Sequence, residues 1–354
     1  MDLEFTTDQI ELRDNARSVL AGACPTSLVR GVFEGEDAGA ADKLWATLVE
    51  LGWPAIGVPE ADGGLGLTFV ETGLVVEELA RVVAPSPFVA TVTQFAALAR
   101  ECGADGDWLA RVADGSLTGA AVLDGDITAE PTADGWVLNG VAGHVLDGAA
   151  ADEVAVVAGG HLFVVPSHAV AATPLAVIDP TMPLANLTFS DVRVSGERAT
   201  STVPAEVRRA RDEATTAMAL SVVGTCRVIF ESTLDYAKVR EQFGKPIGSF
   251  QALKHRFARM YLELEKASSL AYFAAVAIAE DDDRRTMAAS MAKAQASECQ
   301  RLLVTDGLQL HGGIGFTWEN DLHFWLKRAK SADAMFGGGA FHRARVAQLL
   351  GLAS

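Results

Sequence analysis

The sequence predicts an α+β protein in three parts: an N-terminal helical domain over residues 1–112, a small antiparallel β-barrel or sandwich over 113–204, and a C-terminal four-helix bundle over 205–354. Apolar residues recur with helical spacing in the first part. Short β-branched runs, separated by Gly, Asp and Pro, fill the second part. Long helical segments with brief connections fill the third part, which is the pattern of a bundle.

The N-terminal part is predicted to contain two well-marked helices and a glycine-rich loop. WATLVELG (Trp45–Gly52) is typical of a helix that ends at glycine. Thr68 and Glu71 have the spacing of a capping box, and the helix that they begin is expected to reach about Val83. The Gly63–Gly66 run that precedes this helix fits a simple turn as well as a functional loop.

Three runs in the middle part are predicted strands. Two are rich in β-branched residues, and the third has a turn signal at each end. These runs are EVAVVA (Glu153–Ala158), HLFVVP (His161–Pro166) and DGWVLNG (Asp134–Gly140). In the C-terminal part the expected helices cover about 208–239, 249–280 and 285–310, and a fourth helix ends near Phe336.

The composition excludes several classes of function. The formal net charge is −17, so we expect no nucleic-acid partner, because contacts to a phosphate backbone need a positive surface. The four cysteines are far apart and form no CxxC pair, which predicts buried free thiols and neither a metal site nor a disulfide framework. The N-terminus has no signal-peptide pattern, and the apolar stretches are interrupted and short for a membrane span. We therefore expect a cytoplasmic protein.

Two stretches of the predicted bundle carry candidate chemistry. REQFGKPIGSFQ (Arg240–Gln251) breaks the chain between two helices and offers a cation, an amide and aromatic rings, which suit a phosphate and a flat ring. Alternatively, Arg240 only complements the C-terminal end of a helix. QLHGGIGFTWEN (Gln309–Asn320) contains glycines that would let backbone amides approach a phosphate. The two stretches together are more specific than either alone.

These two stretches, with LGWPAIGVPEADGGLG (Leu51–Gly66), resemble the acyl-CoA dehydrogenase family, and the order of the three parts agrees over nearly the whole chain. The resemblance implies an oligomer that carries FAD. It implies that a glutamate removes the α-proton of an acyl-CoA thioester while a hydride leaves the β-carbon for the flavin. An electron-transfer flavoprotein then receives the electrons. In this family each flavin is shared between two subunits.

The resemblance also assigns residues to the half of the site that holds the ADP part of a neighbouring subunit's FAD. Arg240 matches the arginine that binds the pyrophosphate, and Phe243 matches the aromatic residue beside it. Gln309 and Gly313 match residues that touch the ADP portion. The full predicted set of cofactor-binding residues is Arg240, Gln242, Phe243, Phe250, Gln251, Gln309, Gly312 and Gly313.

The half of the site that would hold this chain's own flavin ring departs from the family pattern. The family has a threonine-glutamate-proline segment that ends in Gly-Ser, and the corresponding region AVLDGDITAEPTADGW (Ala121–Trp136) lacks the Gly-Ser pair. Matched through a turn at Asn139 and Gly140, His144, Val145 and Leu146 replace the family's trio of tryptophan, isoleucine and threonine or serine. His144 is therefore interpreted as an ordinary surface or core histidine.

Neither of the two positions that carry the family's catalytic base holds an acid. Phe336, in DAMFGGGAFHR (Asp333–Arg343), matches the glutamate that precedes a Gly-Thr pair in many members. Ala214 matches the alternative position on the first bundle helix. Glu213 is adjacent, but one residue along a helix turns a side chain by about 100°. Glu213 thus remains a candidate base only if the match is displaced by one residue.

The hypothesis that follows is a non-catalytic subunit of a heteromeric acyl-CoA dehydrogenase, whose related partner supplies the flavin-ring pocket and the glutamate. This arrangement resembles the actinobacterial α2β2 enzymes for steroid side-chain CoA thioesters. The expected partners are that homologous subunit, an acyl-CoA and an electron-transfer flavoprotein. Two alternatives stay open. One is a self-sufficient homo-oligomeric dehydrogenase with Glu213 as base, and the other is a redox-inactive scaffold or CoA-thioester binding protein.

Overall fold

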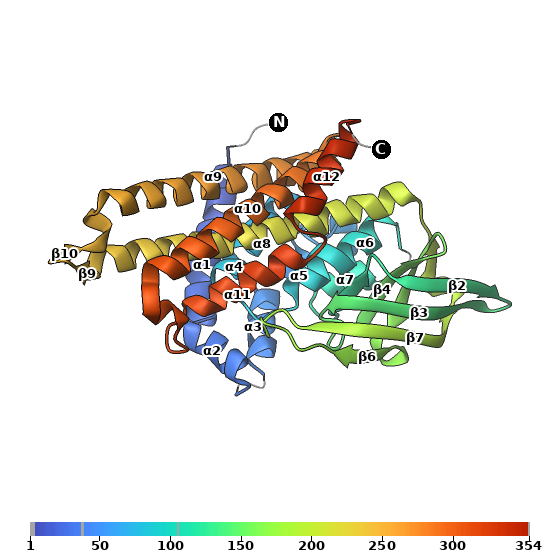
Figure 1. The fold of residues 1–354 in the computed structure, drawn as a ribbon. Helices are drawn as coiled ribbons and strands as arrows, with labels where there is room; N and C mark the ends of the chain where they lie inside the picture. Colours follow the sequence, from blue (N-terminus) through green and yellow to red (C-terminus); the bar gives the residue numbers. More distant parts are fainter. Residues whose placement is uncertain (1–3, 37–38, 105, 353–354) are drawn as a thin grey trace. The chain divides into compact units, whose positions relative to one another are not determined.

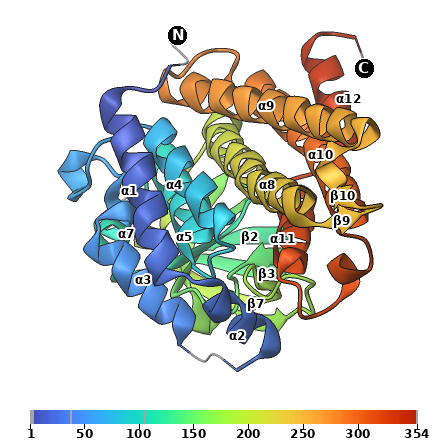
Figure 2. The same ribbon diagram turned by 90° about the vertical axis from the view of Figure 1, so that its left-hand side faces the viewer.

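The computed structural model describes residues 4–36, 39–104 and 106–352, and its contacts divide the chain into two compact units (Figures 1 and 2). The bundle unit comprises Met1–Glu36, Gly73–Ala84 and Thr215–Ser354, and the sandwich unit comprises Asp37–Thr72 and Pro85–Ala214. The predicted boundaries at 112 and 204 describe the order of elements along the chain and stay a prediction as domain limits. Each unit is described separately below.

Apart from η4 (Ser167–Ala169) and η5 (Gly196–Arg198), which lie among the strands, the short helices of the sandwich unit precede its strands in the chain. They are α3 (Ala40–Glu50), η1 (Trp53–Ala55), η2 (Glu60–Asp62), α5 (Phe88–Ala90), the π-helical segment η3 (Thr91–Phe95), α6 (Ala96–Glu101) and α7 (Trp108–Ala113). The predicted helix over 45–52 is confirmed within α3, and Gly52 takes a left-handed φ of 71° two residues after it ends.

The glycine run before α4 (Phe69–Arg81) is a tight turn. A Cβ on Gly64 would lie 2.1 Å from the carbonyl oxygen of Val58, so the backbone itself requires glycine there. The predicted capping box is confirmed: Glu71 accepts the backbone amide of Thr68 at 2.9 Å, and the Thr68 hydroxyl accepts the amide of Val70. Packing of the turn therefore accounts for the glycine run. Helix α4 ends at Arg81, two residues before the predicted helix end at Val83.

Two four-stranded sheets form a β-sandwich, as predicted. One sheet has the order β1-β4-β5-β8 and the other β2-β3-β7-β6. All neighbours are antiparallel except β1 and β4, which are parallel. Buried side chains of both sheets share one core cluster that includes Val156, Phe163 and Leu187. The strands are β1 (Gly119–Val122), β2 (Asp126–Thr132), β3 (Gly135–Leu146), β4 (Glu153–Ala158), β5 (His161–Pro166), β6 (Ala171–Pro174), β7 (Leu184–Ser195) and β8 (Ala199–Ser201).

The prediction that a strand ends at Asn139 and Gly140 is wrong. Strand β3 continues to Leu146, and its register with β7 shifts at Leu138/Gly140 and again at Ala142/Val145. Gly140 has φ 138°, and a Cβ there would lie 2.0 Å from the carbonyl oxygen of Asp126 on β2. The Asn-Gly pair therefore marks a bulge inside a strand, where a backbone approaches closely, and not a hairpin turn.

The bundle unit contains the four predicted long helices and several more. Helices α9 and α10 pack on each other (Figure 1). The rings of Phe230 on α8 and Phe257 on α9 meet edge to face. The C-terminal elements are α8 (Pro204–Val239, of which residues from Thr215 belong to this unit), the hairpin β9 (Glu241–Gln242) and β10 (Lys245–Pro246), α9 (Gln251–Ala279), α10 (Arg285–His311), the 3₁₀ segment η7 (Gly312–Phe316), α11 (Leu322–Ala334) and α12 (Gly339–Leu349). Helices α1 (Thr7–Ala23) and α2 (Thr26–Glu34) and most of α4 also belong here.

Helix α8 corrects the expectation that no apolar segment reaches the length of a membrane span. It is long and apolar enough by length and composition, with a mean hydropathy of 1.3 over its most apolar window. However, 72% of that window is buried inside the protein, as in the core helix of a bundle. All four cysteines are free and buried, as predicted.

Candidate cofactor-binding site

The first candidate segment forms a strained hairpin at the end of α8. Glu241 pairs with Pro246 and Gln242 with Lys245, so Phe243 and Gly244 make a two-residue turn. Both turn residues have positive φ, 53° and 76°, as a type I′ turn requires. An aromatic residue rarely adopts this conformation, and the Phe243 side chain is 92% exposed. A strained and exposed aromatic residue at a hairpin tip is typical of a contact site.

The other predicted residues of this segment surround the hairpin. The Phe250 ring lies 6.1 Å from the Phe243 ring in an edge-to-face arrangement, and Lys245 Nζ lies 4.5 Å from the centroid of Phe250. Arg240 is exposed directly after α8, and Gln242 and Gln251 are exposed on either side of the hairpin base. The segment thus presents a guanidinium, two amides and the Phe243 ring to solvent, with Phe250 half-buried behind them.

The second candidate segment is the turn after α10. Gly312 has φ 64°, and neither Gly312 nor Gly313 has a protein atom within 4 Å of the position of a Cβ. In contrast, a Cβ on Gly315 would lie 2.9 Å from the Cβ of His311. Packing therefore explains Gly315 but not Gly313, which leaves an open backbone that a ligand could approach. Gln309 is exposed one turn earlier.

A pair of rings that the sequence reasoning missed joins the two segments. Tyr236, in the last turn of α8, stacks on His311 at the end of α10, with ring centroids 4.6 Å apart. The Tyr236 hydroxyl also donates to the His311 carbonyl at 3.4 Å. The only sequence signal was the position of both residues next to the two motifs. Because of this contact, the hairpin and the glycine turn lie at the same end of the bundle.

This arrangement is chemically suited to the diphosphate and a flat ring of FAD. Arg240 supplies a cation with several donors, the Gly312–Gly313 backbone is sterically open, and Phe243 supplies an exposed ring beside the half-buried Phe250. The donor set therefore fits the ADP part of the cofactor. FAD would supply a hydride acceptor when bound, and these residues have the chemistry to hold its distant end.

The Phe336 position lies in a junction that buried polar groups hold in place. Phe336 and Gly337 are both left-handed, with φ of 56° and 99°, and a Cβ on Gly337 would lie 2.5 Å from the ring of Phe341. Lys293 Nζ, which is fully buried, donates to the carbonyls of Asp333 at 2.5 Å and Gly337 at 3.1 Å. The junction therefore has a defined conformation, although the position of Phe336 itself holds no acid.

His342 completes this junction. Its Nε2 lies 3.0 Å from the Phe336 carbonyl, which can only accept, so Nε2 carries the proton. Nδ1 is buried and has no hydrogen-bond partner within the described part of the chain. Burial and the nearby Lys293 ammonium lower the pKa of His342 to about 4, and burial lowers the pKa of Lys293 to about 8. Sequence reasoning missed both residues, because nothing in the motif marks them.

The alternative base position is buried without an acid of its own. Ala214 has no exposed surface. Glu213 is 4% exposed and bonds to Arg100 with an Nη2–Oε1 distance of 2.5 Å. Arg100 also donates to the Gly57 carbonyl at 3.2 Å, and the Glu213 charge raises the pKa of the guanidinium. This buried ion pair favours a structural role for Glu213 over that of a base.

The trio matched to the family's flavin-packing residues lies on strand β3. His144 is exposed at the second bulge, with φ 59°, and its backbone amide donates to the side chain of Asn186. Val145 and Leu146 are 5% and 3% exposed and belong to the interior of the sandwich unit. His144 is thus a surface histidine, one of the two readings that the sequence offered.

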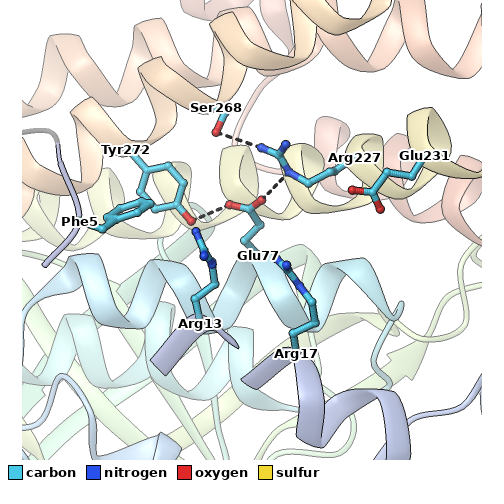
Figure 3. A pocket seen from close by; sticks show the side chains of 8 residues that line it. All are labelled: Phe5, Arg13, Arg17, Glu77, Arg227, Glu231, Ser268 and Tyr272. Atoms are coloured by element: carbon cyan, nitrogen blue, oxygen red, sulfur yellow. Dashed lines mark hydrogen bonds and ion pairs between the residues drawn. The ribbon is translucent and has the colours of Figure 1, made fainter. Parts of the chain in front are cut away.

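A cavity of about 310 Å³ opens among α1, α4, α8 and α9 (Figure 3). At its floor Glu77 accepts the Tyr272 hydroxyl at 2.6 Å and Arg227 Nε at 3.2 Å. Glu78, the next residue, is 2% exposed and pairs with Arg17 at 2.6 Å. Arg17 and Arg227 therefore neutralise buried carboxylates of α4, which makes this a structural ionic network.

Comparison with known proteins identifies the family. The family model of the acyl-CoA dehydrogenase N-terminal domain matches residues 6–116, and that of the C-terminal domain matches residues 210–351. Acyl-CoA dehydrogenase IpdE2 of Mycobacterium tuberculosis is 35% identical over 319 residues, which cover 90% of this chain and 89% of IpdE2. The chain belongs to the acyl-CoA dehydrogenase family, whose members are flavoprotein oxidoreductases that act on acyl-CoA.

Two further similarities extend over nearly the whole chain. Acyl-CoA dehydrogenase FadE34 of Mycobacterium tuberculosis is 33% identical over 349 residues, 96% of this chain, but the chain spans about half of FadE34, 47% of its length. The solved Tcur3481–Tcur3483 steroid ACAD, a G363A variant, has a TM-score of 0.88 and 29% identity over 97% of this chain and 98% of that one. The predicted fold is thereby confirmed, and the family indicates FAD as cofactor.

Proposed function

We propose that this chain is a subunit of a heteromeric acyl-CoA dehydrogenase and contributes the ADP-binding half of a FAD site to a related partner. The partner subunit carries the catalytic glutamate and the flavin-ring pocket. The observation that carries the proposal is the contrast between two halves of the candidate site. The Arg240–Phe243 segment and the open Gly312–Gly313 turn have the residues expected of an ADP-binding half. In contrast, Phe336 and Ala214 stand at the two positions matched to the family's catalytic base.

The exposed hairpin supports a shared site. Phe243 is 92% exposed in a left-handed conformation, and Arg240 beside it is also exposed. A lone subunit gains nothing from such strain, but a ligand held by a neighbouring subunit would cover these groups. The steroid ACAD structure, whose name joins two proteins, supports a heteromer and an acyl group with a steroid skeleton. Electrons would then leave to an electron-transfer flavoprotein.

The test is the flavin content of the chain made alone and made with a related family member. We expect a colourless chain alone and a yellow heterotetramer on co-expression, with one FAD for each pair of unlike subunits. The visible absorbance of the flavin and the mass of the assembly together measure the number of FAD molecules per pair of subunits. A yellow homo-oligomer with one FAD per chain would contradict the proposal and favour the self-sufficient enzyme. No flavin in any assembly would favour the scaffold.

A further inference from the structure

We propose that Arg30 and Glu34 on helix α2 are positioning residues for the glycine turn of the cofactor site and act on it through Trp318. This inference rests on the proposed function, because it concerns how the ADP-binding half is held. All of the groups involved belong to the bundle unit. Glu34 lies 284 residues from Trp318 in sequence, so nothing in the motifs themselves reveals the connection.

Glu34 fixes the indole of Trp318. Trp318 Nε1 donates to Glu34 Oε1 at 2.9 Å. The indole stacks on the His323 ring with a centroid distance of 4.5 Å and an angle of 25°, and Lys327 Nζ lies 4.6 Å from the indole centroid. Trp318 is nevertheless 47% exposed, so it is no ordinary core residue. Hydrogen bonds from Trp318 and Arg30 lower the pKa of Glu34, which keeps this acceptor ionised.

Arg30 fixes the backbone of the same segment. Its guanidinium donates to the carbonyl of Trp318 at 3.2 Å and, at 3.4 Å, to that of Glu319. It also bonds to the carboxylate of Asp321 and, at 3.2 Å, to Glu34. One arginine thus binds two backbone carbonyls and two acids. It links α2 to the segment that leads from the glycine turn into α11.

The glycine turn needs an external support of this kind. No protein atom lies within 4 Å of the point where a Cβ on Gly312 or Gly313 would stand, and Phe316 is 75% exposed. Its entrance is fixed by the buried His311, and its exit, two residues after Phe316, is fixed by Trp318. A glycine-rich turn loses much conformational entropy when it orders around a ligand. Holding both ends in advance lowers that cost and strengthens binding.

The test compares two substitutions at one position in the heteromer. Glu34→Ala removes the acceptor for the indole, and Glu34→Gln keeps an oxygen acceptor there. We expect the FAD dissociation constant of Glu34→Ala to rise about five- to tenfold, the value of one hydrogen bond, and that of Glu34→Gln to stay within about twofold. Turnover at saturating FAD should not change. Glu11→Ala, an exposed acid on α1, is the matched control.

A second readout needs no cofactor. In the chain alone, Glu34→Ala should speed backbone hydrogen exchange over residues 312–321 and leave exchange in α9 unchanged. An unchanged FAD dissociation constant in a folded Glu34→Ala heteromer would overturn the inference. So would a loss of affinity that Glu34→Gln shares in full. Arg240→Ala distinguishes failure of the proposed function from failure of the positioning role. If both Arg240→Ala and Glu34→Ala leave FAD binding intact, the proposed function fails. If only Glu34→Ala leaves it intact, the positioning role alone fails.

Discussion

Tyr236 and His311 stack with their planes 18° apart and their ring centroids 4.6 Å apart, at the ends of α8 and α10. A hydrogen bond also fixes the orientation of the imidazole, because His311 Nδ1 lies 2.9 Å from the Gly307 carbonyl oxygen. Gly307 in turn packs against Ile229 on α8, where a Cβ would lie 2.8 Å from Cγ2. The two segments of the candidate site are therefore joined through packed rings and backbone, not through the site residues themselves.

Removing this stack should separate the two segments. Tyr236→Ala is expected to raise the FAD dissociation constant of the heteromer about fivefold, because one stacked ring pair contributes about 1 kcal/mol beyond its buried area. Tyr236→Phe keeps the ring and should bind FAD within about twofold of the wild type. Tyr261→Ala, at a 49% exposed tyrosine of α9, is the control. Equal losses in Tyr236→Ala and Tyr261→Ala would argue against a link through the stack.

Arg240 should act as a forked donor and not only as a charge. Arg240→Ala is expected to weaken FAD binding about 10- to 100-fold, the range for hydrogen bonds to a charged group. Arg240→Lys keeps the charge but loses the fork, so it should recover only part of this affinity. The exposed Arg259 of α9 provides a control of equal charge in Arg259→Ala. Full recovery in Arg240→Lys would reduce its role to electrostatics.

Glu213 should contribute to stability and not to proton abstraction. Glu213→Gln leaves the guanidinium of Arg100, which is 26% exposed, with only Glu101, 3.5 Å away, as a charged partner. We expect unfolding by urea to show a loss of about 2–3 kcal/mol, below the full value for a buried pair because water reaches Arg100. Turnover of the folded heteromer should stay within about twofold. Glu197→Gln, at an exposed acid, is the control. Loss of turnover without loss of stability would instead make Glu213 the base.

Local pattern was sufficient to predict most elements of the fold. Strands β4 and β5 agree with the β-branched runs residue for residue, and the capping box at Thr68 begins α4. The error at Gly140 arose because an Asn-Gly pair satisfies a turn and a bulge equally well. Only the close approach of β2, which is a tertiary contact, decides between them.

The residues that hold the site could not be predicted in the same way. Arg240 and Gly313 belong to contiguous motifs, so the sequence alone could propose them. Lys293 donates hydrogen bonds to carbonyls that lie 40 and 44 residues away in sequence. Glu34 accepts a hydrogen bond from an indole that lies 284 residues away in sequence. Such residues look like ordinary helix positions until the fold brings their partners to them. A lysine within an alanine-rich helix gives no sign that it is fully buried.

The buried imidazole of His342 should make the protein less stable in acid. Burial lowers its pKa from 6.5 to about 4, so between these values the unfolded chain binds a proton that the native chain does not. The free energy of unfolding therefore falls as pH falls through this window, by about 2 kcal/mol. In His342→Gln, whose amide can still donate to the Phe336 carbonyl, this part of the slope should disappear. His255→Gln, at an exposed histidine, should retain it.

Lys293 should produce a dependence of the same sign at alkaline pH, with stability rising as pH rises. Burial lowers its pKa from 10.5 to about 8, because the charged form loses its hydration, and the Asp333 carboxylate 3.8 Å from Nζ offsets only part of this shift. Below pH 8 both states are protonated and the cost of burying the charge is constant. Between pH 8 and 10.5 the native state releases its proton first, so unfolding free energy rises, by about 3 kcal/mol relative to Lys293→Met. Urea unfolding at pH 7.5 and 10 measures this difference, with Lys330→Met, at an exposed lysine of α11, as control. The prediction is wrong if wild type and Lys293→Met differ in unfolding free energy by the same amount at both pH values. That result would mean that the ammonium is solvated in the native state, contrary to its complete burial.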